Sequence, residues 1–460
     1  MLAVWIAGGI YMSLPYRSTY REIDESMVKI RPTFLVTDSH NYGISAILTT
    51  EMMSIKKLLL IDEKSVSDLT SSFDIIEAIM LYERQYLPLP IDVSGNDTCA
   101  LLSISSVDGS SRHVVRTNRN LIAGIESLEN PESSALAVTD TVAVTGLYSS
   151  TGINFLLHAL ATGSTIAIYD KNDDTPDSTR LLDYINRYAI TSTLLTTRQL
   201  DRCLANKSNV RSLMDVWFVG TAIGVNTHQK ALKMFRQFRK VLNSPEVGWV
   251  TTEYLSEYRT NGNHKTIGRL VAGVELMVVD SNGRSEPHDI IGELCVRSYQ
   301  CAPGYWRNEV ESQQLVMSDG FVRTGEYGYY DRNGLFYIVG HKDQFVKVDD
   351  FMISTEELES ILLTHLTVGE AIVICAEDDN GCEYPKAYVS INPNYKHTGA
   401  AVAEEQSLEN QLREFVNIRI DPRKRLSIDY QSVEMINGEI PTQSHNIKRL
   451  SLKKELETFL

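Results

Sequence analysis

The sequence predicts an α/β protein with a large N-terminal part and a smaller C-terminal part. Three observations predict this class. Short apolar runs alternate with amphipathic runs up to about residue 265. Strand-like runs separated by Asn-Gly turns follow, a pattern typical of antiparallel pairing. The final part combines one helical pattern with a further apolar strand.

The first part has the alternation of a parallel sheet with crossover helices. The apolar runs 34–38 and 57–63 end at acidic residues, as buried parallel strands often do. A strand, helix, strand pattern covers 140–170 and is repeated over 179–197, and 215–220 adds one more strand. The opening run MLAVWIAGGIYMSLPY lacks basic residues and is shorter than the roughly 20 residues of a membrane span. We expect it to be a buried helix that leads into a strand.

Composition excludes some classes of protein. The formal net charge of -15 argues against a nucleic-acid-binding protein but leaves room for a local nucleotide pocket. The six cysteines form no CxxC pair, so we expect core thiols rather than a disulfide framework or a zinc site. With no membrane span and no SKL-type ending, we expect a cytoplasmic protein.

After residue 265, strands are expected over 268–286, 292–298 and 335–341. In the final part, Ser354 and Glu357 form a plausible capping box for a helix whose apolar face includes Leu358 and Leu362. The run 370–377 follows as a strand, and a basic helix is expected at the end of the chain.

The most specific stretch is FVRTGEYGYYDRNGLFYIVGHKDQFVKVDDFMISTEELE, residues 321–359. Together with RNLIAGIESL, WVTTE, GELCVRS and GYWRN, it resembles the adenylate-forming superfamily of acyl- and aryl-CoA synthetases, firefly luciferase and peptide-synthetase adenylation domains. The resemblance implies a large domain over 1–340, with parallel αβα subdomains at about 1–145 and 146–265 and a small β-barrel at about 266–340. A small mobile α+β lid domain over 341–460 is also implied. By the same resemblance, we expect this sequence to start after the first strands and helices that such proteins usually have.

The resemblance also implies a reaction. Members bind a carboxylic acid and ATP with Mg²⁺, form an acyl-adenylate, and usually transfer the acyl group to a thiol such as that of CoA. The expected partners are therefore a small-molecule acid and a nucleotide. The phosphate loop falls on SISSVDGSSRHVV, after a strand ending at Leu102, where Ser105, Gly109 and Arg112 take family positions. Asp108 departs from the family's pattern in this loop. Its carboxylate would repel a polyphosphate.

Other family positions are kept or replaced one by one. In GWVTTE, Trp249 is expected to stack on adenine, Thr252 matches the family threonine, and Glu253 matches the magnesium ligand. Glu326 replaces the aspartate that holds the ribose hydroxyls, and His341 replaces an arginine that contacts ribose or phosphate. Asp343 takes the hinge position.

Two replacements near the catalytic positions are less conservative. Asp350 stands where the family has a glycine, and Asn446 stands where it has the lysine that reaches the reacting carboxylate. Lys448 is a candidate substitute if the loop shifts, although a solvated role at the start of a basic helix is the favoured reading. The acyl pocket is expected to be lined by Tyr148, Ser149, Val219 and Gly220, without the family's aromatic gate.

These replacements leave two hypotheses. The first is an adenylate-forming ligase of reduced activity. The second is a catalytically inactive relative that binds a nucleotide, an acyl ligand or a protein partner. Magnesium-dependent pyrophosphate exchange distinguishes them.

Overall fold

A computed structural model provides the structure of the chain, and it describes residues 1–14, 20–38, 41–60, 73–74, 92–105, 111–128, 136–144, 146–168, 177–196, 199–200, 203–204, 212–219, 225–254, 266–280, 282–342, 345–348, 351–377, 383–391, 402–419 and 433–436. Contacts divide the chain into two compact units. Unit 1 comprises 1–105, 110–276 and 295–324, and unit 2 comprises 106–109, 277–294 and 325–460. The boundary expected at residue 340 stays a prediction.

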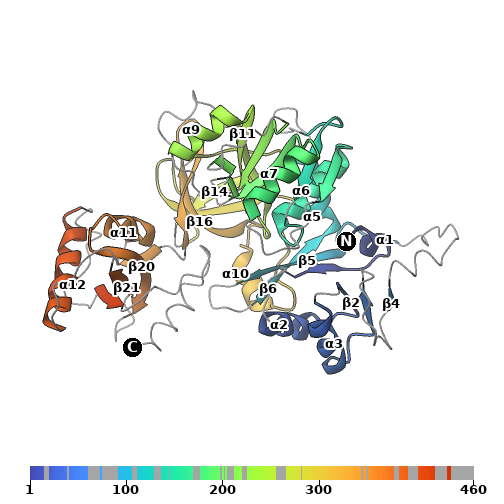
Figure 1. Ribbon diagram of the computed structural model, residues 1–460, viewed down its shortest axis with the longest axis horizontal. Helices are drawn as coiled ribbons and strands as arrows, with labels where there is room; N and C mark the ends of the chain where they lie inside the picture. Colours follow the sequence, from blue (N-terminus) through green and yellow to red (C-terminus); the bar gives the residue numbers. More distant parts are fainter. Residues whose placement is uncertain are drawn as a thin grey trace. The chain divides into compact units, whose positions relative to one another are not determined.

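The N-terminal elements of unit 1 form two small sheets (Figure 1). They are α1 (Leu2–Ile6), β1 (Tyr11–Ser13), α2 (Tyr20–Ile30), β2 (Phe34–Thr37), α3 (Tyr42–Glu51), β3 (Lys57–Leu60), β4 (Phe73–Asp74), β5 (Thr98–Ser105), β6 (Ser111–Thr117) and α5 (Asn118–Glu126). The strand orders are β2-β3-β4, with parallel pairs, and β1-β5-β6, in which β5 and β6 form an antiparallel pair.

The opening helix forms as expected, but it is not buried. None of the five residues that the structure describes in α1 is fully buried, and Leu2 and Ile6 are exposed. The helix is only about one turn long, and its Trp5 Nε1 donates to the Cys99 carbonyl at 2.7 Å. The expectation of a buried helix was therefore wrong, while the strand that follows it is confirmed as β1.

A larger sheet dominates unit 1. Its elements are β7 (Thr141–Val144), α6 (Ser150–Ala161), β8 (Thr165–Ile168), α7 (Asp177–Arg187), β9 (Ser192–Thr196), β10 (Asp215–Val219), α9 (Val225–Met234), β11 (Gln237–Ser244), β12 (Gly248–Tyr254) and β13 (Thr266–Leu270). The order is β13-β12-β11-β10-β9-β7-β8, and the strands from β11 to β8 are parallel neighbours. The predicted strand, helix, strand repeats are confirmed.

Helices cover both faces of this sheet. Leu181, Leu182 and Ile185 of α7 and Ala231 of α9 share a buried cluster with Phe218 and Phe238, while Phe155 and Ala159 of α6 share another with Trp217 and Val241. Because residues on one face of a strand alternate with those on the other, the odd positions of β10 face α6 and the even positions face α7 and α9. No described helix has the length and apolar character needed to cross a membrane.

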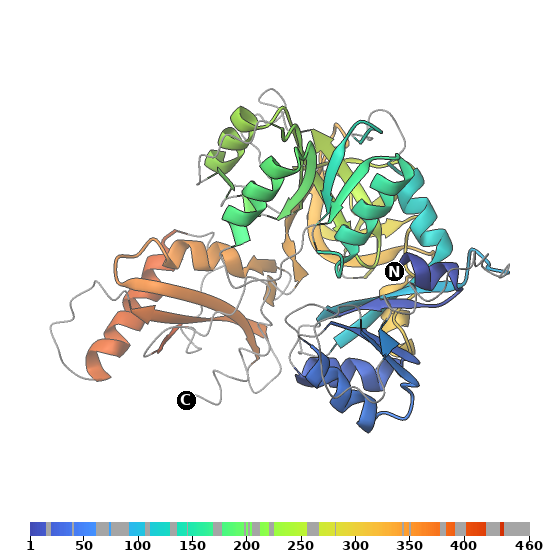
Figure 2. The ribbon, with the colours of Figure 1, turned by 45° about the vertical axis from the view of Figure 1, so that its right-hand side comes forward.

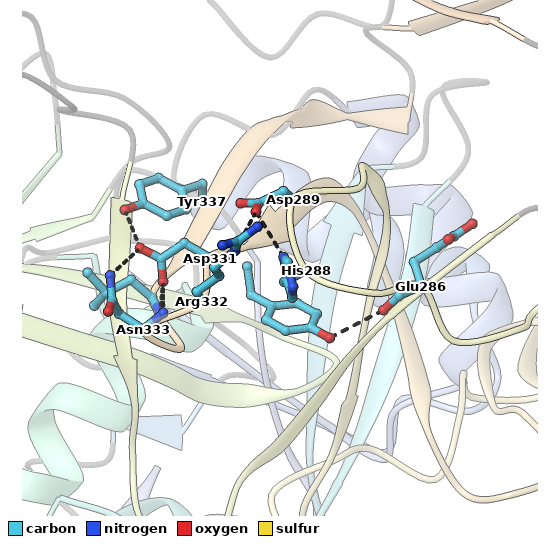
Figure 3. Close-up of polar contacts among 9 residues, drawn as sticks. Glu286, His288, Asp289, Asp331, Arg332, Asn333 and Tyr337 are labelled. Atoms are coloured by element: carbon cyan, nitrogen blue, oxygen red, sulfur yellow. Dashed lines mark hydrogen bonds and ion pairs between the residues drawn. The ribbon is translucent and has the colours of Figure 1, made fainter.

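The part of the chain that follows β13, up to His341, contains four strands and a helix in its described residues. They are β14 (Glu275–Val279), β15 (Gly292–Arg297), α10 (Glu309–Leu315), β16 (Val322–Tyr330) and β17 (Phe336–His341), and the strands lie in the order β14-β15-β16-β17. The turn that joins β16 to β17 is stabilised by Asp331, which accepts the backbone N–H groups of Asn333 and Leu335 at 2.9 Å each and the Tyr337 hydroxyl at 3.2 Å (Figure 3). This is the antiparallel turn that the Asn-Gly pair predicts.

The C-terminal elements of unit 2 form a small α/β layer. They are β18 (Phe345–Val348), β19 (Phe351–Ser354), α11 (Thr355–Leu362), β20 (Val368–Glu377), β21 (Glu383–Ile391), α12 (Val402–Asn417) and β22 (Val433–Ile436). Apolar side chains of α11 and α12 pack on the β20–β21 pair, and Figure 2 shows both helices beside these strands. The helix after Ser354 and the strand over 370–377 are confirmed, and the basic terminal helix lies outside the described residues.

Candidate active site

The expected acyl-pocket residues gather at one edge of the large sheet. Tyr148 and Ser149 follow the carboxyl end of β7, and Val219 is the last residue of β10. Val219 pairs with Val241 of β11, and Val241 pairs with Thr252 of β12, so Val219 and Thr252 lie at the same level. Ligands of α/β proteins bind outside the carboxyl ends of such strands. Gly220 lies outside the described residues.

Ser149 has a structural task at this edge. Its Oγ accepts the Gly152 N–H at 3.1 Å and donates to the Gly146 carbonyl at 2.8 Å, so it is the N-cap of α6. A serine is suited to this position because its oxygen satisfies an N–H that the helix itself cannot. Tyr148 beside it is 44% exposed, which leaves its ring accessible at the edge of the sheet.

Trp249, the first aromatic residue of the GWVTTE motif, is almost fully buried. Its side chain is only 1% exposed, and its ring centroid lies 5.8 Å from that of Trp217 in the core between α6 and the sheet. Its backbone is fixed by Gln300, which accepts the Trp249 N–H at 2.9 Å and donates to the Trp249 carbonyl at 3.1 Å. The ring of Trp249 therefore belongs to the core between α6 and the sheet, and its expected stacking on adenine stays a prediction.

The other residues of the GWVTTE motif follow on β12. Thr252 is partly buried, and Glu253 pairs with Lys240 through the backbone of β11. The side chain of Glu253 lies outside the description, so its role as a magnesium ligand stays a prediction. Among the described side chains, no three His, Cys, Asp or Glu residues lie close enough together to hold a metal ion.

The predicted phosphate loop joins two paired strands. β5 continues to Ser105, three residues beyond the predicted end at Leu102, and Ser105 pairs with Ser111 at the start of β6. The strand is longer than predicted because 111–117 supplies an antiparallel partner, which the sequence reading assigned to the loop and helix. Residues 106–110, with Gly109, lie outside the described part of the chain.

Arg112 and His113 are both engaged within the protein. Arg112 Nε lies 2.7 Å from Glu311 Oε2 of α10, and its guanidinium lies 5.7 Å from the centre of the Tyr305 ring. Glu311 therefore offsets the charge that was expected to face a phosphate. His113 is 2% exposed, its Nδ1 is 3.2 Å from Ser103 Oγ, and burial lowers the pKa of His113 to about 4. It is a neutral core residue near pH 7.

Two of the expected nucleotide contacts, Glu326 and His341, come together in unit 2. Glu326 and His341 are directly paired residues of β16 and β17. Gly325 precedes Glu326 with φ +73°, and a Cβ at this position would lie 2.7 Å from His341 Nε2. Any larger residue at position 325 would clash with the His341 imidazole, so glycine is required for this packing between β16 and β17. This arrangement of a carboxylate beside an imidazole is suited to the hydroxyls of a ribose. The described residues do not include Asp343, Asp350, Asn446 or Lys448.

A buried charged network at the amino end of β10 was missed by the sequence reading. Arg239 Nε lies 3.5 Å from Asp215 Oδ1, both side chains are almost fully buried, and Trp217 Nε1 donates to Asp215 Oδ2 at 2.9 Å. The Arg239 guanidinium also lies 4.5 Å from the centre of the Trp217 ring. The one available signal was Asp215 at the start of the otherwise apolar run of β10, because charged residues are seldom fully buried unless they are paired.

The sequence is similar to a known protein family and to several known proteins. The profile described as AMP-binding enzyme matches residues 1–306. The chain is 26% identical to 4-coumarate--CoA ligase-like 8 of Arabidopsis thaliana over 348 residues, which are 73% of this chain and 59% of that protein. It is 26% identical to the peroxisomal OPC-8:0-CoA ligase 1 of Arabidopsis thaliana over 440 residues, which are 92% of this chain and 76% of that protein.

Solved structures share the fold. ATP-bound MatB from Rhodopseudomonas palustris superposes with a TM-score of 0.76 at 18% identity, covering 100% of this chain and 86% of that one. The anthranilate CoA ligase AuaEII superposes with a TM-score of 0.74 at 19% identity, covering 98% and 84%. The expected α/β fold is thereby confirmed. With the family profile matched over residues 1–306 and this fold throughout, the chain belongs to the AMP-binding enzyme family of adenylate-forming ligases.

Proposed function

We propose that the protein activates a carboxylic acid with ATP and passes the acyl group to a thiol such as that of CoA, with slow turnover. The observation that carries this proposal is the gathering of Tyr148, Val219 and Thr252 at the carboxyl edge of the sheet. Several relatives are named as CoA ligases, and one structural neighbour is described as ATP-bound, which supports the same reaction class.

The reaction has two displacement steps. A carboxylate oxygen of the acid attacks the α-phosphorus of ATP, and pyrophosphate leaves. The sulfur of a thiol then attacks the acyl carbon, loses its proton, and AMP leaves. Glu326 and His341 would hold the ribose, Thr252 would lie beside the reacting groups, and Glu253 would hold Mg²⁺. A bound Mg²⁺ would offset the negative charge of the phosphates.

Slow turnover is expected because the chain lacks free positive charges at positions where the family uses them to stabilise the reacting groups. Removing one preorganised contact to a developing charge typically costs about 100- to 1,000-fold in rate. Asn446 replaces a family lysine, and Arg112 is already paired with Glu311. The Arg112 pairing is also the observation that favours the second candidate function, a nucleotide-binding protein without turnover.

Magnesium-dependent ATP–pyrophosphate exchange with a panel of carboxylic acids tests the proposal. We expect exchange above background for at least one acid, a loss of that exchange in E253Q, and faster exchange in N446K. A thermal shift with ATP but no exchange for any acid, in the wild type or in N446K, would sink the ligase proposal and support the second candidate.

A further inference from the structure

Tyr305 lies beside β6, the strand that follows the predicted phosphate loop. The two neighbours of Tyr305 form hydrogen bonds of 3.0 and 2.8 Å with the backbone of β6, and Tyr305 lies opposite Val114. Residues two positions apart on a strand share one face, and directly opposed residues of an antiparallel pair lie on the same side. The side chain of Tyr305 is therefore on the same face as Arg112 and Arg116, between the two arginines.

The tyrosine hydroxyl reaches the turn that joins β11 to β12. It donates to Glu246 Oε1 at 3.2 Å, and Ser244 Oγ donates to Glu246 Oε2 at 3.1 Å. Arg116, which is fully buried, donates from Nη1 to the Pro245 carbonyl at 3.0 Å. This turn follows the carboxyl end of β11, the edge at which ligands of α/β proteins bind, and it leads into GWVTTE. Tyr305 thus connects the phosphate-loop hairpin to the turn before a second predicted nucleotide motif.

The ring of Tyr305 supports the guanidinium of Arg112. The two lie 5.7 Å apart, within the range of a cation–π contact, and Glu311 is the second partner of the arginine at 2.7 Å. Burial and the Glu246 carboxylate raise the pKa of Tyr305, and Arg112 opposes that shift. The hydroxyl is therefore protonated near pH 7 and donates to Glu246. The carboxylate fixes the ring on which the arginine lies.

An arginine held in this way is prepared for a second partner. A phosphate group that displaces Glu311 would meet a guanidinium that the Tyr305 ring already holds. Immobilising one long side chain in advance removes part of the entropy cost of binding, a factor of about three to ten in affinity.

We propose that Tyr305 is a positioning residue of the nucleotide site, whose ring, anchored on Glu246, holds the Arg112 guanidinium for the phosphates of ATP. This inference rests on the proposed function, because it takes residues 103–115 as the phosphate loop of an ATP-dependent ligase. Tyr305 acts through Arg112, so its removal should matter only while the arginine is present.

The affinity for ATP, measured by calorimetry without an acid, tests this role. Y305L removes the ring and the hydroxyl and should weaken ATP binding about three- to tenfold. Y305F keeps the ring in its apolar surroundings and loses only the anchor to Glu246, so we expect a smaller loss, about two- to threefold, and the thermal unfolding of the wild type.

A double-mutant cycle with Arg112 separates positioning from a general effect on the fold. R112Q should itself weaken ATP binding, and Y305L should add less than about a twofold effect in the R112Q background. Y20F is the matched control, because the Tyr20 hydroxyl also donates to a carboxylate, Glu51 Oε2, at 2.8 Å, on another pair of helices. It should bind ATP like the wild type.

The outcomes distinguish this inference from the proposed function. Wild-type ATP affinity in both Y305L and Y305F overturns the inference, as does an undiminished effect of Y305L in the R112Q background or an equal loss in Y20F. Pyrophosphate exchange by the wild type then still supports the ligase. The expected affinities without exchange for any acid support the inference and argue against the ligase. No detectable ATP binding by the wild type overturns the inference together with the nucleotide site.

Discussion

Gly325 is the residue at which backbone geometry most directly determines the candidate nucleotide site. With φ +73° and His341 Nε2 only 2.7 Å from the position of a Cβ, alanine here meets both strain and a clash. We expect G325A to lose more than the roughly 1–2 kcal/mol that a left-handed conformation costs an ordinary residue. Gly334 is a matched control, since its φ is also +73° and a Cβ there meets nothing within 4 Å. Urea unfolding that gives equal losses for G325A and G334A would contradict the proposed packing of His341.

Asp215 carries the compensating charge for a buried arginine. Burial raises the pKa of Asp215, although Arg239 opposes that shift. D215N keeps an oxygen for Trp217 Nε1 but removes the charge, so Arg239 is left uncompensated, and we expect a loss of about 3–5 kcal/mol in the free energy of unfolding. E275Q, which breaks the exposed pair with Arg297, should change stability little. Chemical denaturation of both variants checks this, and similar effects would refute the buried-pair argument.

Residue identity alone predicted some site positions and missed others. Glu326 was expected at the ribose and His341 at the ribose or a phosphate, and the two are paired residues of β16 and β17. Their contacts with a nucleotide stay predictions. Trp249 was expected to stack on adenine because an aromatic residue before Thr-Glu resembles a stacking ring, and its packing against Trp217 could not be predicted from that motif. Arg239 and Asp215 are 24 positions apart in sequence, so only the parallel pairing of β10 with β11 brings them together.

At the level of single elements, α6 depends on its cap. Ser149 satisfies the Gly152 N–H, so S149A should destabilise the helix start by about 1 kcal/mol. S149T and S149D keep a capping oxygen and should retain most of the stability. Wild-type stability in S149A would show that the cap is not used.

The β5–β6 hairpin restrains the charge expected to face the phosphates. Arg112 is paired with Glu311 while both are partly exposed, and such pairs contribute at most about 1 kcal/mol. Releasing Arg112 with E311Q should therefore tighten ATP binding about two- to fivefold, if the arginine reaches the phosphates. E309Q removes the same charge from the same helix and is the control. Unchanged ATP affinity in E311Q, measured by calorimetry, would remove Arg112 from the nucleotide site.

Elements were predicted better than their pairing. The alternation of apolar runs fixed β7 to β10 and their helices, because a parallel sheet buries both faces of each strand. The second strand of the hairpin, 111–117, was missed because its first residues, Ser-Arg-His, do not alternate between apolar and polar. Only the pairing with β5 shows that they belong to a strand. Its partner is adjacent in sequence, but the intervening serines and glycine resembled a functional loop more than a turn.

Two of the buried histidines, His113 and His158, give the whole molecule a predicted acid sensitivity. Burial lowers the pKa of His113 and of His158 to about 4, whereas the unfolded chain keeps its imidazoles near 6.5. Above pH 7 both states are neutral, so their stabilising contribution is complete. As the pH falls from 6.5 towards 4, the unfolded state binds protons that the folded state does not, and the free energy of unfolding decreases. At pH 5 the loss is about 2 kcal/mol for each histidine, from about 1.4 kcal/mol per pH unit.

Urea unfolding at pH 7 and at pH 5 measures this loss in the free energy of unfolding. The double variant H113N/H158F should lose most of this difference, and H288Q, at an exposed position, should keep it. An equally large pH dependence in the double variant would place the acid sensitivity elsewhere in the chain.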